Sequence, residues 1–208
     1  MNITIQFARD VTDACGIQSL GKGISTMKTA YQIDSAHSGV HFSVRHLMLS
    51  NVRGTFSGVT GTVLYDPADP ASTEADATVD TATLSTGDPK RDEHLKTADF
   101  LDMAEYPEIT FKAKRTEKTG DGAFKMTGDL TIHGVTHEVT LSVEDVSPEA
   151  KDPWGAIRIG ATAKTKIDRR QFGISWNSPL ETGGVLIGDE VKLELDLEFT
   201  KVQTASAG

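Results

Sequence analysis

The chain has 208 residues, of which 38% are hydrophobic and 25% are charged, and this composition fits one globular domain with a sizeable core. Its net charge of −9 argues against a nucleic-acid-binding surface, which needs an excess of Lys and Arg. No uninterrupted apolar run in the sequence approaches the roughly 18 residues of a membrane-spanning helix. Cys15 is the only cysteine, which excludes an intramolecular disulfide.

The first part of the chain shows no sustained periodicity. We expect residues 1–29 to be a flexible N-terminal extension, residues 30–203 to form a single β-barrel domain, and residues 204–208 to be a flexible tail. Arg9, Asp10 and Asp13 interrupt the apolar stretch that an export signal would need. The sequence therefore predicts a cytoplasmic protein.

From Tyr31 onward, apolar and polar residues alternate with a period of two, which is typical of strands with one buried and one solvated face. Near the C-terminus, for example, Val191 and Leu193 alternate with Lys192 and Glu194. In chain order, the pattern predicts strands within residues 40–48, 50–58, 59–66, 73–84, 108–115, 123–132, 138–146, 154–168 and 191–199. Short turns rich in Gly, Asp and Pro join them, which indicates an antiparallel meander of about eight or nine strands.

One stretch, "GDPKRDEHLKTADFLDM" (residues 87–103), has the features of a helix. Asp88 is suited to the N-cap, and Pro89 is suited to the first helical position. This helix interrupts the series of strands, so we expect it to plug one end of a barrel.

A sheet of this many twisted strands closes into a barrel or splits into two layers. The inward positions include several small residues: Gly54, Ala75, Ala77, Ala113, Gly128, Ala161 and Ala163. A dry core would leave voids beside them, and voids lower stability, whereas a lipophilic guest inside a barrel would fill the same space. The alternative is a flattened sandwich whose layers approach until the small residues meet.

Four segments carry a more specific pattern: "YQIDSAHSGVHFSVRHLMLSNVRGTFSGVTG", "RDEHLKTADFLDMAEYPEITFKA", "GDLTIHGVTHEVTL", and "DRRQFGISWN" followed by "GVLIGDEVKLELDLEF". In this order they resemble the YceI family of lipocalin-like polyisoprenoid-binding proteins, over residues 31–202. The resemblance implies an all-β fold, an eight-stranded antiparallel lipocalin-like barrel with one short helix inserted between strands, around an elongated apolar tunnel. It also implies a long isoprenoid ligand, such as a polyprenyl phosphate or the tail of a quinone. Many family members are exported, whereas the first residues of this chain do not show the pattern of an export signal.

The family pattern includes the basic or imidazole side chains of His37, His46, Arg91, His94 and Arg169, and the last four concern the tunnel mouth. Parity places His46 on the inner face of its strand, and Arg91 and His94 share one face of the helix. We expect a polar cluster at one mouth of the tunnel, where it would meet an anionic or quinone headgroup. An alternative stays open for His46, which could instead be a structural residue satisfied by hydrogen bonds within the fold.

The arginines have a structural alternative as well. Asp92 and Asp168 could pair with Arg91 and Arg169 and so lock the helix and a late loop onto the barrel.

The predicted ligand-binding residues share an inward position or a place in the family pattern. They are Phe42, Val44, His46, Phe56, Ala77, Val79, Arg91, His94, Phe100, Phe111, Met126, Ile159, Ala161, Arg169, Phe172 and Trp176.

The sequence offers little for catalysis or metal binding. His133 and His137 are spaced like a helical metal-ligand pair, but a turn containing glycine separates them. With neither a nucleophile elbow nor a phosphate loop in the sequence, we predict no enzyme, no cofactor and no metal. Residues 172–184 suit either a lid over a cavity mouth or an ordinary connection.

Three classes of function remain. The first is non-catalytic binding, storage or transport of a long-chain isoprenoid lipid. The second is an enzyme acting on a bound isoprenoid, with an acid or base such as His46, and the third is a stress-related or interaction protein with a filled barrel. The expected partners are an isoprenoid or quinone-type ligand and, transiently, a membrane from which lipid is loaded, but no nucleic acid; the sequence leaves open whether the chain forms a homodimer.

Overall fold

The computed structural model describes residues 28–66, 68–180 and 184–203. The predicted N-terminal extension lies outside the described residues up to residue 27, and the predicted C-terminal tail, 204–208, lies outside them as well. The first strand begins at Thr29, close to the predicted start of the domain.

The described residues form eleven strands, one α-helix and three short 3₁₀ helices. The strands are β1 (Thr29–Ile33), β2 (Gly39–His46), β3 (Ser50–Phe56), β4 (Val59–Tyr65), β5 (Glu74–Asp80), β6 (Glu108–Gly120), β7 (Ala123–Ile132), β8 (Val135–Glu144), β9 (Ala150–Lys151), β10 (Ile157–Asp168) and β11 (Ile187–Lys201). The helices are α1 (Pro89–Leu95) and the 3₁₀ helices η1 (Pro70–Ser72), η2 (Thr81–Thr83) and η3 (Arg169–Phe172). Within the described ranges, no helix is long and apolar enough to cross a membrane.

Eight strands close into an antiparallel barrel. They run in the order β11-β1-β4-β5-β6-β7-β8-β10, and pairing between β10 and β11 closes the ring. The predicted eight-stranded lipocalin-like barrel with one inserted helix is therefore confirmed, and the flattened sandwich is wrong.

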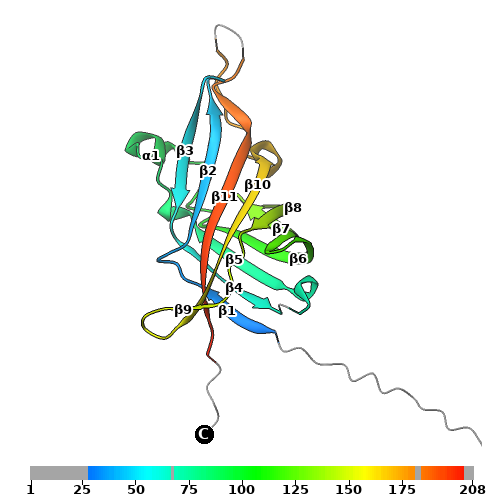
Figure 1. The fold of residues 1–208 in the computed structure, drawn as a ribbon. Helices are drawn as coiled ribbons and strands as arrows, with labels where there is room; N and C mark the ends of the chain where they lie inside the picture. Colours follow the sequence, from blue (N-terminus) through cyan, green and yellow to red (C-terminus); the bar gives the residue numbers. More distant parts are fainter. Residues whose placement is uncertain (1–27, 67, 181–183, 204–208) are drawn as a thin grey trace, which may run out of the picture.

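The long strand β11 changes its partner along its length. Its C-terminal part pairs with β1, where Ile33 lies opposite Phe199. Its N-terminal part pairs with β2, where Val44 lies opposite Val191. As a result, the β2–β3 hairpin rises beside the upper part of β11, whose other edge stays paired with β10 (Figure 1).

Helix α1 begins where the sequence predicts and ends earlier. The Asp88 side chain accepts hydrogen bonds from the backbone N–H groups of Lys90 (3.0 Å) and Arg91 (3.3 Å), as an N-cap does. The helix ends at Leu95 instead of continuing to residue 103. Asp102 has a φ of 43°, which a continuous right-handed helix excludes.

Two hydrophobic clusters fill much of the interior. The larger one occupies the barrel on the side of β1 and consists of Tyr31, Ile33, Val40, Phe56, Val59, Val79, Leu84, Ile159 and Phe199. The smaller one lies near α1 and η3 and consists of Phe100, Leu130, Ile132, Phe172 and Ile174. The barrel is therefore packed over part of its length.

Aromatic rings cover two of the small inward residues. A Cβ added to Gly54 would lie 2.3 Å from the ring of Phe42, and a Cβ added to Gly128 would lie 2.7 Å from the ring of Phe111. The prediction of empty space beside these two glycines is wrong, because a large side chain of a neighbouring strand already occupies it.

Candidate functional site

A cavity of about 400 Å³ lies where the β2–β3 hairpin, the N-terminal part of β11 and α1 meet. Most of its lining side chains are apolar, including the facing pairs Val44 with Val191 and Phe42 with Leu193. Its volume falls in the range of pockets that hold one small molecule, roughly 300–1,000 Å³.

Ten of the sixteen predicted ligand-binding residues line this cavity. They are Phe42, Val44, His46, Phe56, Arg91, His94, Phe100, Arg169, Phe172 and Trp176.

The other six predicted residues lie outside that lining. Val79 and Ile159 belong to the larger hydrophobic cluster, and Ala77 and Ala161 pack against it. Phe111 packs against the smaller cluster. Met126 is half-buried on β7. The long tunnel implied by the resemblance is thus interrupted by packed side chains.

Sequence reasoning missed several lining residues. Val191, Leu193 and Ile187 come from β11, and Leu95 and Leu101 come from α1 and the turns that follow it. The alternation in β11 was a usable signal, because it places Val191 and Leu193 on the inner face. The missing information was which part of β11 borders the cavity, and this depends on strand pairing.

The polar lining groups all belong to basic or histidine side chains. They are Arg45, His46, Lys90, Arg91, His94 and Arg169, and the lining contains no Asp or Glu among the described residues. In a chain with a net charge of −9, this local excess of positive charge favours an electron-rich or anionic group.

Arg169 is buried, with 4% of its surface exposed. Its guanidinium donates to the carbonyl oxygens of Ile174 (2.8 Å), Trp176 (2.9 Å) and Gly188 (3.0 Å). It also forms an ion pair with Asp189 at 3.2 Å. Burial lowers the pKa of this guanidinium. Arg169 therefore ties the segment after η3 to β11, as the structural alternative expects, although its acidic partner is Asp189.

Asp168 has a different role from the predicted one. Its carboxylate accepts a hydrogen bond from the backbone N–H of Arg170 at 2.9 Å and so caps η3.

Arg91 and Asp92 both bind Thr86, the residue that leads into α1. Arg91 Nε donates to Thr86 Oγ1 (2.7 Å) and Arg91 Nη2 donates to the Thr86 carbonyl (2.9 Å). The Thr86 backbone N–H donates to Asp92 Oδ1 (2.9 Å). The helix is therefore anchored by both side chains, through Thr86 instead of through a direct Asp92–Arg91 ion pair.

His94 is held on several sides. Its Nε2 lies 2.9 Å from Asp99 Oδ2. Its ring meets those of Phe100 and Trp176 edge to face, at centroid distances of 5.0 Å and 4.9 Å. The imidazole is thus oriented by a carboxylate at the edge of the cavity.

His46 lines the cavity and is half-buried. Within the ranges that the structure describes, its imidazole has no hydrogen-bond, ion-pair or ring partner, while its backbone carbonyl accepts a bond from Leu49 N–H at 3.0 Å. Its ring nitrogens are therefore available to a ligand. This favours the headgroup hypothesis over the structural one.

The segment predicted as a lid contributes Phe172, Ile174 and Trp176 to the cavity wall. Asn177 fastens it to β11, because its Nδ2 donates to the Ile187 carbonyl (2.7 Å) and its Oδ1 accepts from Ile187 N–H (3.0 Å). Residues 181–183 lie outside the described residues. The segment therefore borders the cavity, and its role as a lid stays a prediction.

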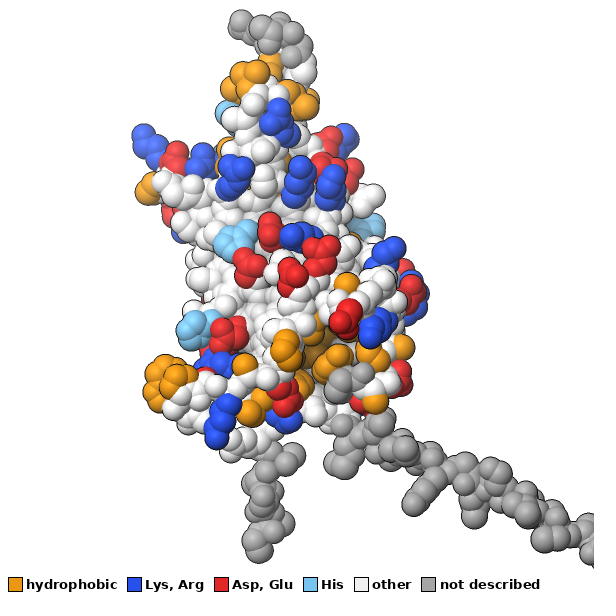
Figure 2. Space-filling model, viewed as in Figure 1, with side chains coloured by type: hydrophobic (Ala, Val, Ile, Leu, Met, Phe, Trp, Pro, Cys, Tyr) orange, Lys and Arg blue, Asp and Glu red, His pale blue; other side chains and the backbone are white. Residues whose placement is uncertain are grey.

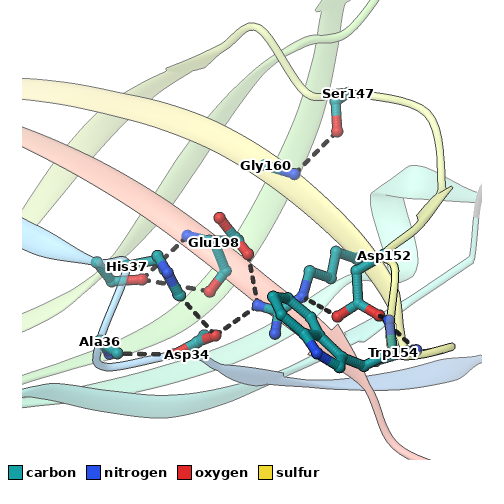
Figure 3. A network of polar contacts seen from close by, with 11 residues as sticks. Asp34, Ala36, His37, Ser147, Asp152, Trp154, Gly160 and Glu198 are labelled. Atoms are coloured by element: carbon teal, nitrogen blue, oxygen red, sulfur yellow. Dashed lines mark hydrogen bonds and ion pairs between the residues drawn. The ribbon is translucent and has the colours of Figure 1, made fainter.

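One cluster away from the cavity has the residue types of a metal site. The ligand atoms of Asp34, His37 and Glu198 lie within 4.8 Å of one another. However, Arg158 Nη1 donates to both carboxylates (Figure 3), and its hydrogen bond to Asp34 is the main cause that lowers the pKa of that carboxyl to about 2. The guanidinium already supplies the positive charge, so this network holds the β1–β2 turn, β10 and β11 together.

A second hollow, of about 530 Å³, lies at the other end of the barrel, and Ile159 is part of its lining. It is bordered by Lys118, Asp121, Asp145 and Glu149. Charged groups of both signs make it less suited to a hydrocarbon chain than the first cavity.

Comparison with known proteins agrees with this fold. The family described as "YceI-like domain" matches residues 31–199. A UPF0312 protein of Staphylococcus aureus is 37% identical over 173 residues, which cover 83% of this chain and 98% of the relative.

Two solved structures are similar to the described fold. The crystal structure of Burkholderia cenocepacia BcnA has a TM-score of 0.70 and 25% identity, and the match covers 80% of this chain and 98% of BcnA. A polyisoprenoid binding domain from Saccharophagus degradans, implicated in plant cell wall breakdown, has a TM-score of 0.60 and 16% identity, and the match covers 84% of this chain and all of that domain. At this identity, the second match supports the fold alone.

Proposed function

Because the chain belongs to the family of YceI-like domains, we propose that it is a lipid-binding protein whose cavity takes the apolar chain of an isoprenoid and stores or carries it. The observation that carries the proposal is the cavity itself. Its walls are apolar, and its polar groups are all basic or imidazole side chains. The name of the Saccharophagus domain points to the same class of ligand.

The energetics favour a long chain over a short one. Burial of hydrocarbon contributes roughly 0.8 kcal/mol per CH₂ group, so ten buried carbons give about 8 kcal/mol. Association costs about 4–15 kcal/mol. A short chain would therefore bind marginally and a longer one tightly.

We propose that the headgroup, a quinone ring or a phosphate, lies at the end of the cavity near His46. Arg91 and Arg169 already bind protein groups, whereas the His46 imidazole has no partner within the described part of the chain. Lys90 also lines the cavity from α1. The side chains of His46 and Lys90 would hydrogen-bond the oxygens of the headgroup.

The experiment is extraction of the purified protein with organic solvent, followed by mass spectrometry. We expect one isoprenoid species in a near-stoichiometric amount. An extract without an apolar species, from protein produced in a host that makes isoprenoids, would overturn the proposal.

One observation favours a catalytic alternative. The His94–Asp99 pair at 2.9 Å resembles the oriented imidazole of acid–base catalysis. Incubation with the extracted lipid would test it, since turnover that disappears in His94→Gln would make the protein an enzyme.

A further inference from the structure

The upper end of the molecule presents exposed apolar side chains. We define the hairpin tip as Leu47, Met48 and Leu49, which connect β2 and β3, together with the adjacent Val185. Met48 is 58% exposed, Leu49 80% and Val185 39%. A hydrogen bond from Leu47 N–H to the Leu186 carbonyl (2.8 Å) joins the two segments. The tip is thus an ordered apolar projection.

The backbone of the tip makes its composition unusual. Leu47 and Met48 have φ values of 53° and 58°. This left-handed conformation favours Gly, Asn or Asp and is unfavourable for large side chains. Turn chemistry alone would select small polar residues here, so the apolar side chains call for a reason outside local folding.

Basic side chains surround the base of the tip. We call Arg45, Arg53, Lys90 and Lys192 the basic collar. Arg45 Nη2 donates to the Met48 carbonyl (2.8 Å), and Arg53 on β3 and Lys192 on β11 lie opposite Ser43 on its two sides. Figure 2 shows basic side chains gathered just below the apolar upper end.

The collar keeps its positive charge. None of its four members forms an ion pair with a carboxylate within the ranges that the structure describes. The acidic residues of β11 beside it are already paired, Asp189 with Arg169, Glu190 with Lys166 and Glu194 with Lys164. An anionic surface can therefore approach this end even though the whole chain is negative.

The cavity extends to the same end of the molecule. Arg45 and Lys90 of the collar line it, as does Leu186 beside the tip. The opposite end offers an exposed apolar residue too, Trp154 at 87%. There, however, Asp152 accepts hydrogen bonds from the backbone of Trp154 and from Arg158 (Figure 3). Beside this turn, one basic side chain without an ion pair in the described residues, Lys151, takes the place of the four in the collar.

We propose that the hairpin tip inserts into the surface of an anionic lipid bilayer while the basic collar contacts the lipid phosphates. An apolar surface edged by Lys and Arg has the composition of an interfacial membrane anchor. Docking in this orientation brings the cavity mouth to the membrane, so that a lipid can pass without crossing water. This inference rests on the proposed lipid-binding function.

The experiment is co-sedimentation with vesicles of phosphatidylcholine alone and of phosphatidylcholine mixed with phosphatidylglycerol. We expect binding to the anionic vesicles that weakens as salt is added. The double variant Met48→Asn, Leu49→Ser should bind at least about tenfold more weakly, because two apolar side chains no longer insert. Asparagine suits the positive φ at position 48. Arg53→Ser should weaken binding about fivefold, the effect of one lost charge.

Trp154→Ser is the matched control, because it removes a larger exposed apolar side chain from the other end. We expect its vesicle binding to equal that of the wild type. Three results would each overturn the proposal: no binding of the wild type to anionic vesicles, equal binding by the tip variant, or loss of binding in Trp154→Ser. A dimer that the tip variant dissociates, without vesicle binding, would assign the tip to a second copy of the chain instead.

Lipid extraction from the same proteins separates this inference from the proposed function. A tip variant that retains its lipid but does not bind vesicles supports both. A wild type that binds vesicles but yields no lipid retains the docking surface and removes the proposed cargo. A wild type that yields lipid but does not bind vesicles retains the cargo and removes the docking surface.

Discussion

Replacement of Arg169 by Met tests whether this arginine is structural. Methionine keeps most of the apolar stem and removes the guanidinium, so the carbonyl oxygens of Ile174, Trp176 and Gly188 lose their donors. Hydrogen bonds from a charged group contribute about 1.5–3 kcal/mol each, and relaxation limits the total for a buried cation to about 3–5 kcal/mol. We expect the free energy of unfolding to fall by that amount. With a slope of about 2 kcal/mol/M, the urea midpoint would drop by about 2 M.

Arg170→Met is the control for this change. Arg170 is the adjacent residue, with 63% of its side chain exposed and a single long ion pair to Asp189 at 3.6 Å, so its loss should hardly move the midpoint. Equal midpoints for the two variants would refute the structural role. A variant Arg169→Met that stays stable but loses its lipid would make this arginine a headgroup residue.

Two further predictions concern the cavity and a third concerns the ion-pair network of Asp34. His46→Leu should weaken binding of the complete lipid and leave binding of the headless hydrocarbon nearly unchanged. Stability should change little, because the imidazole has no partner within the described residues. Paired titrations and urea melts check this, and equal losses of affinity for both ligands would contradict it. Val191→Trp should fill the cavity and displace lipid without lowering the melting temperature. Ala161→Trp should overpack the larger hydrophobic cluster and cost about 1–3 kcal/mol. Thermal melts of delipidated protein check this, and a similar drop in both variants would place Val191 in a dry core. The pKa of Asp34 is lowered from 3.8 to about 2, so its contribution to stability is present above pH 3.8 and is lost as the pH falls toward 2. In urea melts over this range, the free energy of unfolding of Asp34→Asn should depend less on pH than that of the wild type. Identical pH profiles would contradict the stabilising role of the Asp34 carboxylate.

The regular part of the fold could be predicted from the sequence because burial repeats with the strand period. Val191 and Leu193 face inward and Lys192 and Glu194 are exposed, as their alternation predicts. The start of α1 followed from Asp88 and Pro89, since capping is a local interaction. The period does not say which strand pairs with which, so the transfer of β11 from β1 to β2 was not predictable.

Two features of the site were beyond sequence patterns for a different reason. The partners of Arg169 are mainly backbone carbonyls. Every residue has a backbone carbonyl, so no residue type in the sequence indicates which ones bind Arg169. The space over Gly54 is occupied by Phe42 from the neighbouring strand. A count of small residues cannot register this, because it considers one strand at a time.

On one edge, strand β11 pairs first with β2 and then with β1, and these two parts of the strand differ in their surroundings. Where β11 pairs with β1, Phe199 packs with Ile33 in the larger hydrophobic cluster, and the barrel is filled. Where β11 pairs with β2, Val191 lines the cavity opposite Val44, and its other neighbour is Ile167 of the ring strand β10. The β2–β3 hairpin itself lies outside the closed ring, and an edge hairpin with fewer packed neighbours opens at lower free energy than a closed barrel. We therefore expect amide hydrogen exchange to be faster in β2 and β3 than in β7 and β8.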